Sequence, residues 1–278
     1  MKIRLWGTRG SLANASSETE RYGGNTSCVS VLGRDGTLLV LDAGTGIRAL
    51  GSELDCAGKR IDILLTHLHM DHLQGLGFFK PLYDPEAAVH IWGPSSTTLD
   101  LRARLARYLS PPLFPVRLRD LPCQLSLHDV PVHRVRVGKF VVTAQLVCHP
   151  GPTVGYRISE GRATVVYIPD HEPALATQPF PGAPEWTSGF DLAQGADLLI
   201  HDAQYTNEEY PNHFGWGHST MDHALAFAEL AGVKRLMPFH HDPSHDDRLL
   251  DEMIAHARAA APEGLEIVAG KEGSEIDL

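Results

Sequence analysis

The stretch Leu64-Leu65-Thr66-His67-Leu68-His69-Met70-Asp71-His72 places four potential metal ligands within six positions, at the end of an apolar run. That run, residues 61–65, is typical of a buried strand. Residues two apart in an extended chain project to the same side, so His67 and His69 can share one cation. Zinc takes imidazole nitrogen and carboxylate oxygen at roughly 2.0–2.2 Å. The stretch therefore predicts a metal site, because histidines clustered without a metal would leave several imidazoles together at a strand end.

Further apolar runs and helical segments extend this pattern in both directions. Runs typical of strands cover residues 3–6, 27–32, 37–41, 89–92, 139–147, 153–158, 163–168, 197–201, 235–238 and 265–268. Helical periodicity covers residues 99–109, 219–231 and 247–260. So many strands, alternating with helices, predict a layered α/β protein with two sheets. We expect one domain over residues 1–278, with a basic helix-loop insertion at about 99–139.

Composition places the chain among ordinary globular proteins. Its 278 residues are 43% hydrophobic and 21% charged, and no segment approaches the roughly 20 apolar residues of a membrane span. The first residues read as a strand and lack the features of a secretory signal, so we expect a cytoplasmic protein with no membrane contact. No Cys-x-x-Cys pair occurs, which predicts reduced thiols at Cys28, Cys56, Cys123 and Cys148.

Charge is unevenly distributed along the chain. Lys and Arg number 24 against 34 Asp and Glu, and the net charge of −10 argues against broad, sequence-independent binding to nucleic acid. Between residues 101 and 139, however, eight basic side chains accompany only two acidic ones. This basic island could face an anionic substrate, or its arginines could solvate a helix face. Its members are Arg102, Arg104, Arg107, Arg117, Arg119, Arg134, Arg136 and Lys139.

The run His67-x-His69-x-Asp71-His72 resembles the signature of the metallo-β-lactamase superfamily, and an acid, Asp42, precedes it as in that family. The resemblance extends nearly end to end. It implies a four-layer αββα sandwich, with two sheets face to face, helices outside and metals held by loops at one edge. Asp42 resembles a family carboxylate that accepts an imidazole N–H and so fixes the tautomer that binds metal. An acid that closes a strand turn is its alternative role.

The resemblance also implies the remaining ligands of two divalent cations. The implied set is His67, His69 and His149 for the first metal, Asp71, His72 and His240 for the second, and Asp170 between the two. His241 adjoins His240 and is an alternative for the final ligand. Zinc is the expected metal, with manganese or iron as alternatives, because ligand types alone do not decide between them.

The segment Gly217-His218-Ser219-Thr220 is similar to the catalytic His-Ser/Thr segment of ribonuclease Z and related phosphodiesterases. The resemblance implies that His218 donates a proton to the leaving alkoxide, for which an imidazole pKa near 6.5 is suited. A histidine that merely precedes a helix cap is the alternative. The opening Gly7-Thr8-Arg9-Gly10-Ser11 also resembles this branch, which includes phosphoribosyl cyclic phosphate phosphodiesterases. Arg9 is a candidate phosphate contact, or it binds carbonyls structurally.

We therefore expect a dinuclear metal-dependent hydrolase that acts on small or cyclic phosphodiesters. The nucleophile would be a hydroxide bridging the metals, which exists at neutral pH because metal binding lowers the pKa of water to about 7. His218 and Asp71 are the expected catalytic residues. The chain shows no long glycine-rich arm of the kind with which ribonuclease Z grips tRNA, so a small anionic substrate is favoured over nucleic acid.

Three other functions compete with this expectation. A tRNA-processing endonuclease of ribonuclease Z type draws support from the basic island. A thioester or lactone hydrolase uses the same kind of metal site. A regulatory module could retain metals without turnover, since ligands alone do not establish catalysis. The apolar segment 109–115 is a candidate homodimer interface.

Overall fold

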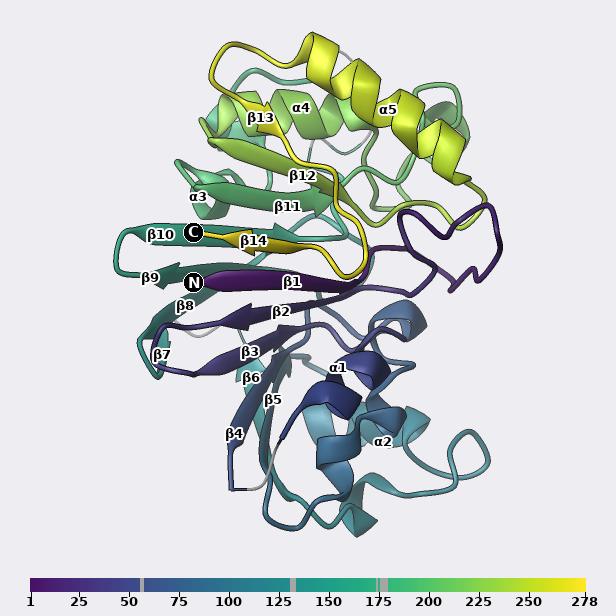
Figure 1. Ribbon diagram of the computed structural model, residues 1–278, viewed down its shortest axis with the longest axis vertical. Coiled ribbons are helices and arrows are strands. Elements are labelled where there is room, and N and C mark those ends of the chain that lie inside the picture. The colour runs from purple at the N-terminus through teal and green to yellow at the C-terminus, as the bar shows by residue number, and fades with distance from the viewer. Residues whose placement is uncertain (56–57, 131–133, 174, 176–179) are drawn as a thin grey trace.

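Strand side chains alternate between two environments, and this alternation divides the protein into layers. In β3 (Leu38–Leu41), Leu39 and Leu41 face the opposite sheet, while Val40 packs toward the outer helices. The computed structural model describes residues 1–55, 58–130, 134–173, 175 and 180–278. Within these residues two seven-stranded sheets lie face to face with helices outside (Figure 1). The expected four-layer αββα sandwich is confirmed.

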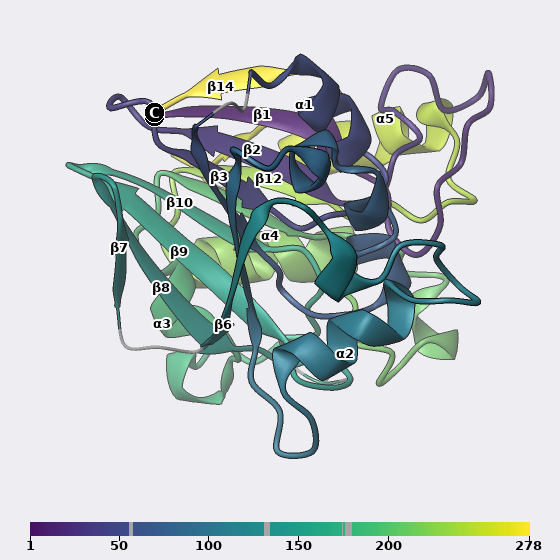
Figure 2. The ribbon, with the colours of Figure 1, turned by 90° about the horizontal axis from the view of Figure 1, so that it is seen from below.

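Each sheet combines parallel and antiparallel strands. The first sheet has the order β14 (Glu275–Asp277), β1 (Lys2–Gly7), β2 (Cys28–Leu32), β3, β4 (Arg60–Leu64), β5 (Ala88–Pro94) and β6 (Gln124–Val130). The second has the order β13 (Glu266–Ile267), β12 (Arg235–Phe239), β11 (Leu198–Asp202), β10 (Ala163–Ile168), β9 (Val154–Glu160), β8 (Phe140–Leu146) and β7 (Val135–Val137). Seen from below, β1 to β3 and β7 to β9 separate into two layers (Figure 2).

Three apolar cores hold the layers together. The core between the sheets includes Val29 and Leu41 from the first sheet and Tyr156 and Ile200 from the second, all fully buried. Helices α1 (Ile47–Glu53) and α2 (Leu101–Tyr108) cover the outer face of the first sheet, and α3 (Phe190–Ala193), α4 (Met221–Leu230) and α5 (Asp247–Ala260) cover the second. Burial of these apolar faces supplies the main driving force for folding.

Side-chain caps set the starts of the longer helices. The Thr220 hydroxyl accepts a hydrogen bond from the amide of His223 at the start of α4. The Asp246 carboxylate caps α5 in the same way. Short 3-10 turns, η1 (Met70–His72), η2 (Leu76–Phe78), η3 (Lys80–Tyr83), η4 (Leu118–Asp120), η5 (Pro184–Trp186) and η6 (Tyr210–Asn212), complete the described elements.

Five described helices and strands were missing from the sequence expectation: α1, α3, β6, β7 and β14. Within the insertion expected at about 99–139, residues 124–130 form β6 and pair in parallel with β5. The single domain with an insertion stays a prediction. The basic island does not form one patch. Exposed Arg102 and Arg117 belong to the α2 region, whereas exposed Arg136 and Lys139 lie at the β7–β8 hairpin of the other sheet. Residues 131–133, within the expected insertion, lie outside the described part.

The remaining sequence expectations concern thiols, membranes and a dimer surface. Cys28, Cys123 and Cys148 are free, and Cys56 lies outside the described residues. Among the described helices, none combines the length and apolar character that a membrane crossing requires. In segment 109–115, Leu109 and Phe114 are buried in the core beneath α2, so much of its apolar character serves folding. The homodimer stays a prediction.

Parallel pairing brings several strand ends to one edge of the sandwich. β3, β4 and β5 run parallel in the first sheet, as do β10, β11 and β12 in the second. Ligand sites of α/β proteins lie outside the carboxyl ends of such strands. Asp42 follows β3, His67 follows β4, Asp170 follows β10 and His240 follows β12. The topology therefore gathers residues that are far apart in the sequence.

Candidate metal centre

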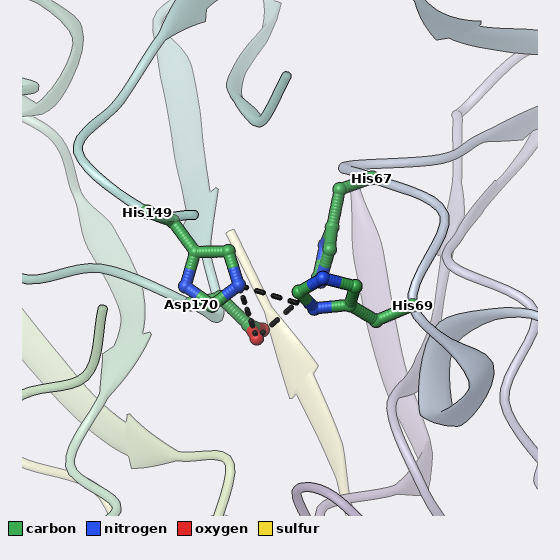
Figure 3. A group of neighbouring side chains, drawn as sticks. All are labelled: His67, His69, His149 and Asp170. Carbon is green, nitrogen blue, oxygen red and sulfur yellow. Dashed lines mark hydrogen bonds and ion pairs between the residues drawn. The ribbon is translucent and has the colours of Figure 1, made fainter. Parts of the chain in front are cut away.

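Three histidines and one aspartate from three segments of the chain converge at this edge (Figure 3). Asp170 Oδ2 lies 3.6 Å from His67 Nε2 and 3.7 Å from His149 Nε2. His149 Nε2 lies 3.2 Å from His69 Nδ1. One ligand atom from each of the four residues lies within 4.8 Å of the others. This first ligand group, His67, His69, His149 and Asp170, can hold one cation.

A second ligand group lies beside the first and shares Asp170 with it. It consists of Asp71, His72, His240 and Asp170, all buried. Asp71 Oδ2 lies 3.2 Å from His72 Nε2 and 3.1 Å from His240 Nε2. Asp170 Oδ1 lies 3.0 Å from His72 Nε2 and 3.3 Å from His240 Nε2. The structure thus brings together all seven expected ligands, with Asp170 facing both groups.

Asp42 binds the His72 ring through Nδ1, the ring nitrogen that does not face the second ligand group. Its Oδ2 accepts a hydrogen bond from His72 Nδ1 at 2.8 Å and from the Tyr167 hydroxyl at 3.0 Å. The Thr66 amide donates to Oδ1 at 2.7 Å. These bonds hold a fully buried carboxylate in place, and they leave His72 Nε2 to face the second ligand group.

Two other ligands are oriented through their outer ring nitrogens. His240 Nδ1 lies 2.9 Å from the side-chain oxygen of Gln204, an acceptor, so Nε2 is left for the second ligand group. His149 Nδ1 donates to the Gly217 carbonyl at 2.8 Å, which leaves Nε2 for the first. Gly217 has a φ of 88°, and a side chain there would collide with the His149 ring. The carbonyl therefore reaches His149 because this position is glycine.

Several buried atoms of the cluster lack the partners that buried polar groups require. His67 Nε2 and Asp170 Oδ1 have no hydrogen-bond partner within the described part of the chain. His149 Nε2 faces His69 Nδ1 although its proton is committed to Gly217 on the other side. A cation would satisfy these atoms together, and the set of imidazole and carboxylate donors fits zinc, manganese or iron. The residues present therefore fit the implied metals.

The protonation states of His67, His149, Asp71 and Asp170 also suit metal binding. Burial lowers the pKa of His67 and His149, which favours the neutral imidazole that ligates metal. Burial alone would raise the pKa of Asp170, but the neighbouring imidazoles, His240 and His72 foremost, hold it well below its usual range. The pKa of Asp71 is lowered against burial in the same way, chiefly by His72. Both aspartates are therefore carboxylates at neutral pH.

Two turns at the metal centre use unusual backbone conformations. Asp42 has a φ of 58° and His240 a φ of 61°, a region that residues other than glycine seldom adopt. Gly10 packs against the His240 ring so closely that a side chain there would collide with it. His241 is directed elsewhere and lies buried with its ring centroid 5.7 Å from that of Tyr22. Of the two adjacent histidines, His240 is the one at the cluster.

His218 lies beside both ligand groups. Its ring centroid is 5.1 Å from that of His149 and 5.0 Å from that of His240. His218 Nδ1 lies 2.7 Å from Asp202 Oδ2, and Asp202 is fully buried. Burial lowers the pKa of His218, but the Asp202 carboxylate outweighs it and raises the pKa to about 9. This histidine therefore holds a proton at neutral pH.

Arg9 is not directed into the metal cluster. Its side chain is fully buried, its Nε donates to the Gly23 carbonyl at 2.8 Å, and its Nη1 donates to the carbonyls of Asp242 and His245 at 3.1 and 2.6 Å. A phosphate contact would require the guanidinium to leave these partners. The geometry corresponds to the structural alternative, in which Arg9 ties the N-terminal loop to the segment after His240, and we propose no substrate contact for it.

The family membership follows from a match to residues 37–241, which cover more than half of the chain. These residues match the family model described as the Beta-lactamase superfamily domain. The chain therefore belongs to the β-lactamase superfamily, and the resemblance carried by the histidine run is confirmed.

The similar proteins include a ribonuclease Z and two proteins of the same fold. Ribonuclease Z of Trichodesmium erythraeum (strain IMS101) is 25% identical over 270 residues, which cover 81% of this chain and 82% of the relative. The metallo-β-lactamase fold protein YhfI of Bacillus subtilis matches with a TM-score of 0.70 at 20% identity. The match covers 99% of this chain and 98% of the YhfI chain. A diphosphatase of the PhnP family has a TM-score of 0.68 at 18% identity, with 100% and 97% covered. These two structures share the fold.

Sequence reasoning missed Asp202, Gln204 and Glu172. Asp202 ends β11 and Gln204 follows closely, which places them at the same edge as Asp42 and Asp170. An acid at the end of an apolar strand was the available signal for Asp202. Glu172, buried two residues beyond Asp170, accepts hydrogen bonds from the amides of Gly215 and Gly217. The sequence alone carries no signal for that contact, because it joins distant loops.

Proposed function

We propose that the protein is a phosphodiesterase that uses two divalent cations, zinc being the expected metal. The first and second ligand groups would hold one cation each, with Asp170 between them. When bound, such a pair supplies Lewis-acid stabilisation of phosphoryl oxygens and a hydroxide nucleophile at neutral pH. The observation that carries the proposal is the position of His218, which Asp202 holds next to both groups.

His218 is suited to protonate the leaving oxygen of a phosphodiester. A general acid must carry its proton at working pH, and the Asp202 carboxylate raises the pKa of His218 to about 9. The imidazole faces the side of the cluster where His149 and His240 meet it, so its proton is near the position of a bound phosphate. A lactam or lactone leaving group also needs a proton, and a direct assay must separate these reactions.

We favour a small or cyclic diester as the substrate. The net charge of −10 opposes non-specific RNA binding, and the basic island is divided between the α2 region and the β7–β8 hairpin. A tRNA-processing endonuclease is the second candidate, because the relative from Trichodesmium erythraeum is named Ribonuclease Z. Four exposed arginines near α2, Arg102, Arg107, Arg117 and Arg119, give this candidate its structural support.

One comparison of substrates tests the proposal. Zinc- or manganese-loaded protein is assayed with adenosine 2′,3′-cyclic phosphate, bis(p-nitrophenyl) phosphate, a precursor tRNA, a thioester and a lactone. We expect turnover of the two small diesters that exceeds turnover of the others and disappears with a chelator. Turnover of the precursor tRNA alone would favour the endonuclease, turnover of only the thioester or lactone would overturn the phosphodiesterase, and no turnover with metal bound would favour a regulatory module.

A further inference from the structure

A row of aromatic side chains runs from His218 to the surface. The Tyr205 ring lies edge-on to His218 with centroids 5.9 Å apart and stacks on His213 at 4.3 Å. His213 in turn lies edge-on to Trp216 at 4.8 Å. Tyr205 is 4% exposed and Trp216 is 59% exposed. This aromatic row, Tyr205, His213, Trp216 and His218, thus connects the proposed general acid to an exposed indole.

The turn that carries Trp216 is firmly anchored. Buried Glu172 accepts hydrogen bonds from the Tyr210 hydroxyl at 2.7 Å, the Gly215 amide at 3.1 Å and the Gly217 amide at 2.9 Å. The Trp216 amide also donates to the His213 carbonyl at 3.1 Å. A single exposed apolar side chain is ordinary on a protein surface. An exposed indole on a backbone turn that a buried carboxylate holds in place is a preorganised contact surface.

Trp216 also lies next to the first ligand group. Gly217, its neighbour in the chain, accepts the hydrogen bond of His149 Nδ1 through its carbonyl, and His218 follows directly. The same short segment, Trp216 to His218, therefore presents the indole and orients a metal ligand. A phosphodiester protonated by His218 would place its leaving group on this side of the cluster.

We propose that Trp216 determines specificity by stacking on a base or other aromatic ring carried by the leaving group. This inference rests on the proposed phosphodiesterase function and names its substrate class, a nucleoside phosphodiester such as a cyclic nucleotide. Every base presents a π-face, and loss of one base–aromatic stack weakens binding by roughly 10- to 100-fold. Trp216 does not touch the reacting atoms, so its substitution should change KM rather than kcat.

The test compares two cyclic diesters that differ in whether they carry a ring. The substrates are adenosine 2′,3′-cyclic phosphate and glycerol 1,2-cyclic phosphate, and the variants are Trp216→Ala, Trp216→Phe and the control Trp186→Ala. Trp186 is 77% exposed on η5 and lies outside the aromatic row. We expect Trp216→Ala to lower the kcat/KM ratio of the adenosine to the glycerol substrate by roughly 10- to 100-fold through KM. Trp216→Phe should restore most of the ratio, and Trp186→Ala should not change it.

An equal loss on both substrates, or an unchanged ratio, would overturn the stacking role. A second readout separates this failure from failure of the proposed function. Binding of adenosine 5′-monophosphate and glycerol 3-phosphate to the metal-loaded protein is measured by calorimetry. Suppose that neither diester is hydrolysed while adenosine 5′-monophosphate still binds more tightly than glycerol 3-phosphate, and only when Trp216 is present. That result would support the stacking role and contradict the proposed phosphodiesterase function. If the wild-type protein binds both monoesters equally, the inference is wrong.

Discussion

The two ligand groups share Asp170 but differ in their surroundings. All four residues of the second group are buried, and side chains of Asp42 and Gln204 orient its histidines. In the first group His69 is exposed, and the partner that orients His149 is the backbone carbonyl of Gly217. The difference indicates a division of tasks: the enclosed group fixes a cation, and the open group, next to His218 and Trp216, meets solvent and substrate.

Asp170→Asn tests what the groups have in common, and it should give the largest effect. Because Asp170 faces both groups, its loss should weaken both metal sites and reduce kcat/KM by roughly 10⁴-fold, which corresponds to about 5.5 kcal/mol. Metal content after dialysis and turnover of bis(p-nitrophenyl) phosphate are the measurements. The control Asp191→Asn removes an exposed carboxylate on α3 and should change neither quantity. Retention of two metals and full turnover by Asp170→Asn would contradict the shared role.

His218→Ala separates proton transfer from metal binding. We expect a fall in kcat of roughly 10²- to 10³-fold with an alkoxide leaving group, because general acid catalysis contributes on that order. With p-nitrophenolate, which leaves without a proton, the loss should be smaller, and metal content should stay unchanged. The matched control is His256→Ala, a histidine 58% exposed on α5. An equal loss for both leaving groups would argue against the role as acid.

Asp42→Asn should distinguish the enclosed group from the open one. The carboxylate accepts the hydrogen bond of His72 Nδ1, and loss of such a partner weakens metal affinity by roughly 10- to 100-fold. The effect should appear at the second ligand group, so one equivalent of metal becomes easier to remove while the other is retained. Titration with a chelator resolves the two equivalents. If both metal equivalents become easier to remove to the same extent, the proposed difference between the two ligand groups is wrong.

The pH dependence gives the smallest expected effect. His218 acts in its protonated form, so kcat should fall as pH rises through its pKa, which the Asp202 carboxylate raises to about 9. Cations held by the two ligand groups would repel the imidazolium, so we expect the falling limb below that value. In Asp202→Asn the carboxylate that raises this pKa is gone, so the limb should move to still lower pH. The measurement is kcat against pH for both proteins, and an unmoved limb would exclude His218 as the titrating acid.

The sequence predicted those parts of the site that rest on local spacing. His67, His69, Asp71 and His72 follow one apolar run, so their convergence was readable from that segment. The choice between His240 and His241 was not readable, since it depends on a φ of 61° at His240 that turns its ring into the cluster. Asp202 was missed because only the fold brings it into contact with its partner His218. The position of Asp202 at the end of an apolar strand was nevertheless a usable signal.

The same limit explains the errors in the fold. The strand β14 has three residues and is stabilised by pairing with β1 at the opposite end of the chain. Its short stretch carries little periodicity of its own. The strand β6 covers Gln124–Val130, but the proline-rich turn at Pro111, Pro112 and Pro115, after the helix expected at 99–109, suggested a helix-loop insertion there. Arg9 could not be assigned from the sequence, because its carbonyl partners include Asp242 and His245 from the far end of the chain.

Anomalous diffraction from zinc-loaded crystals tests the central claim most directly. The account predicts two zinc peaks, one within each ligand group, with nitrogen and oxygen ligands at about 2.0–2.2 Å and the Asp170 carboxylate in contact with both ions. A fully loaded crystal with zinc in one group only, or with zinc bound away from these seven side chains, would contradict it.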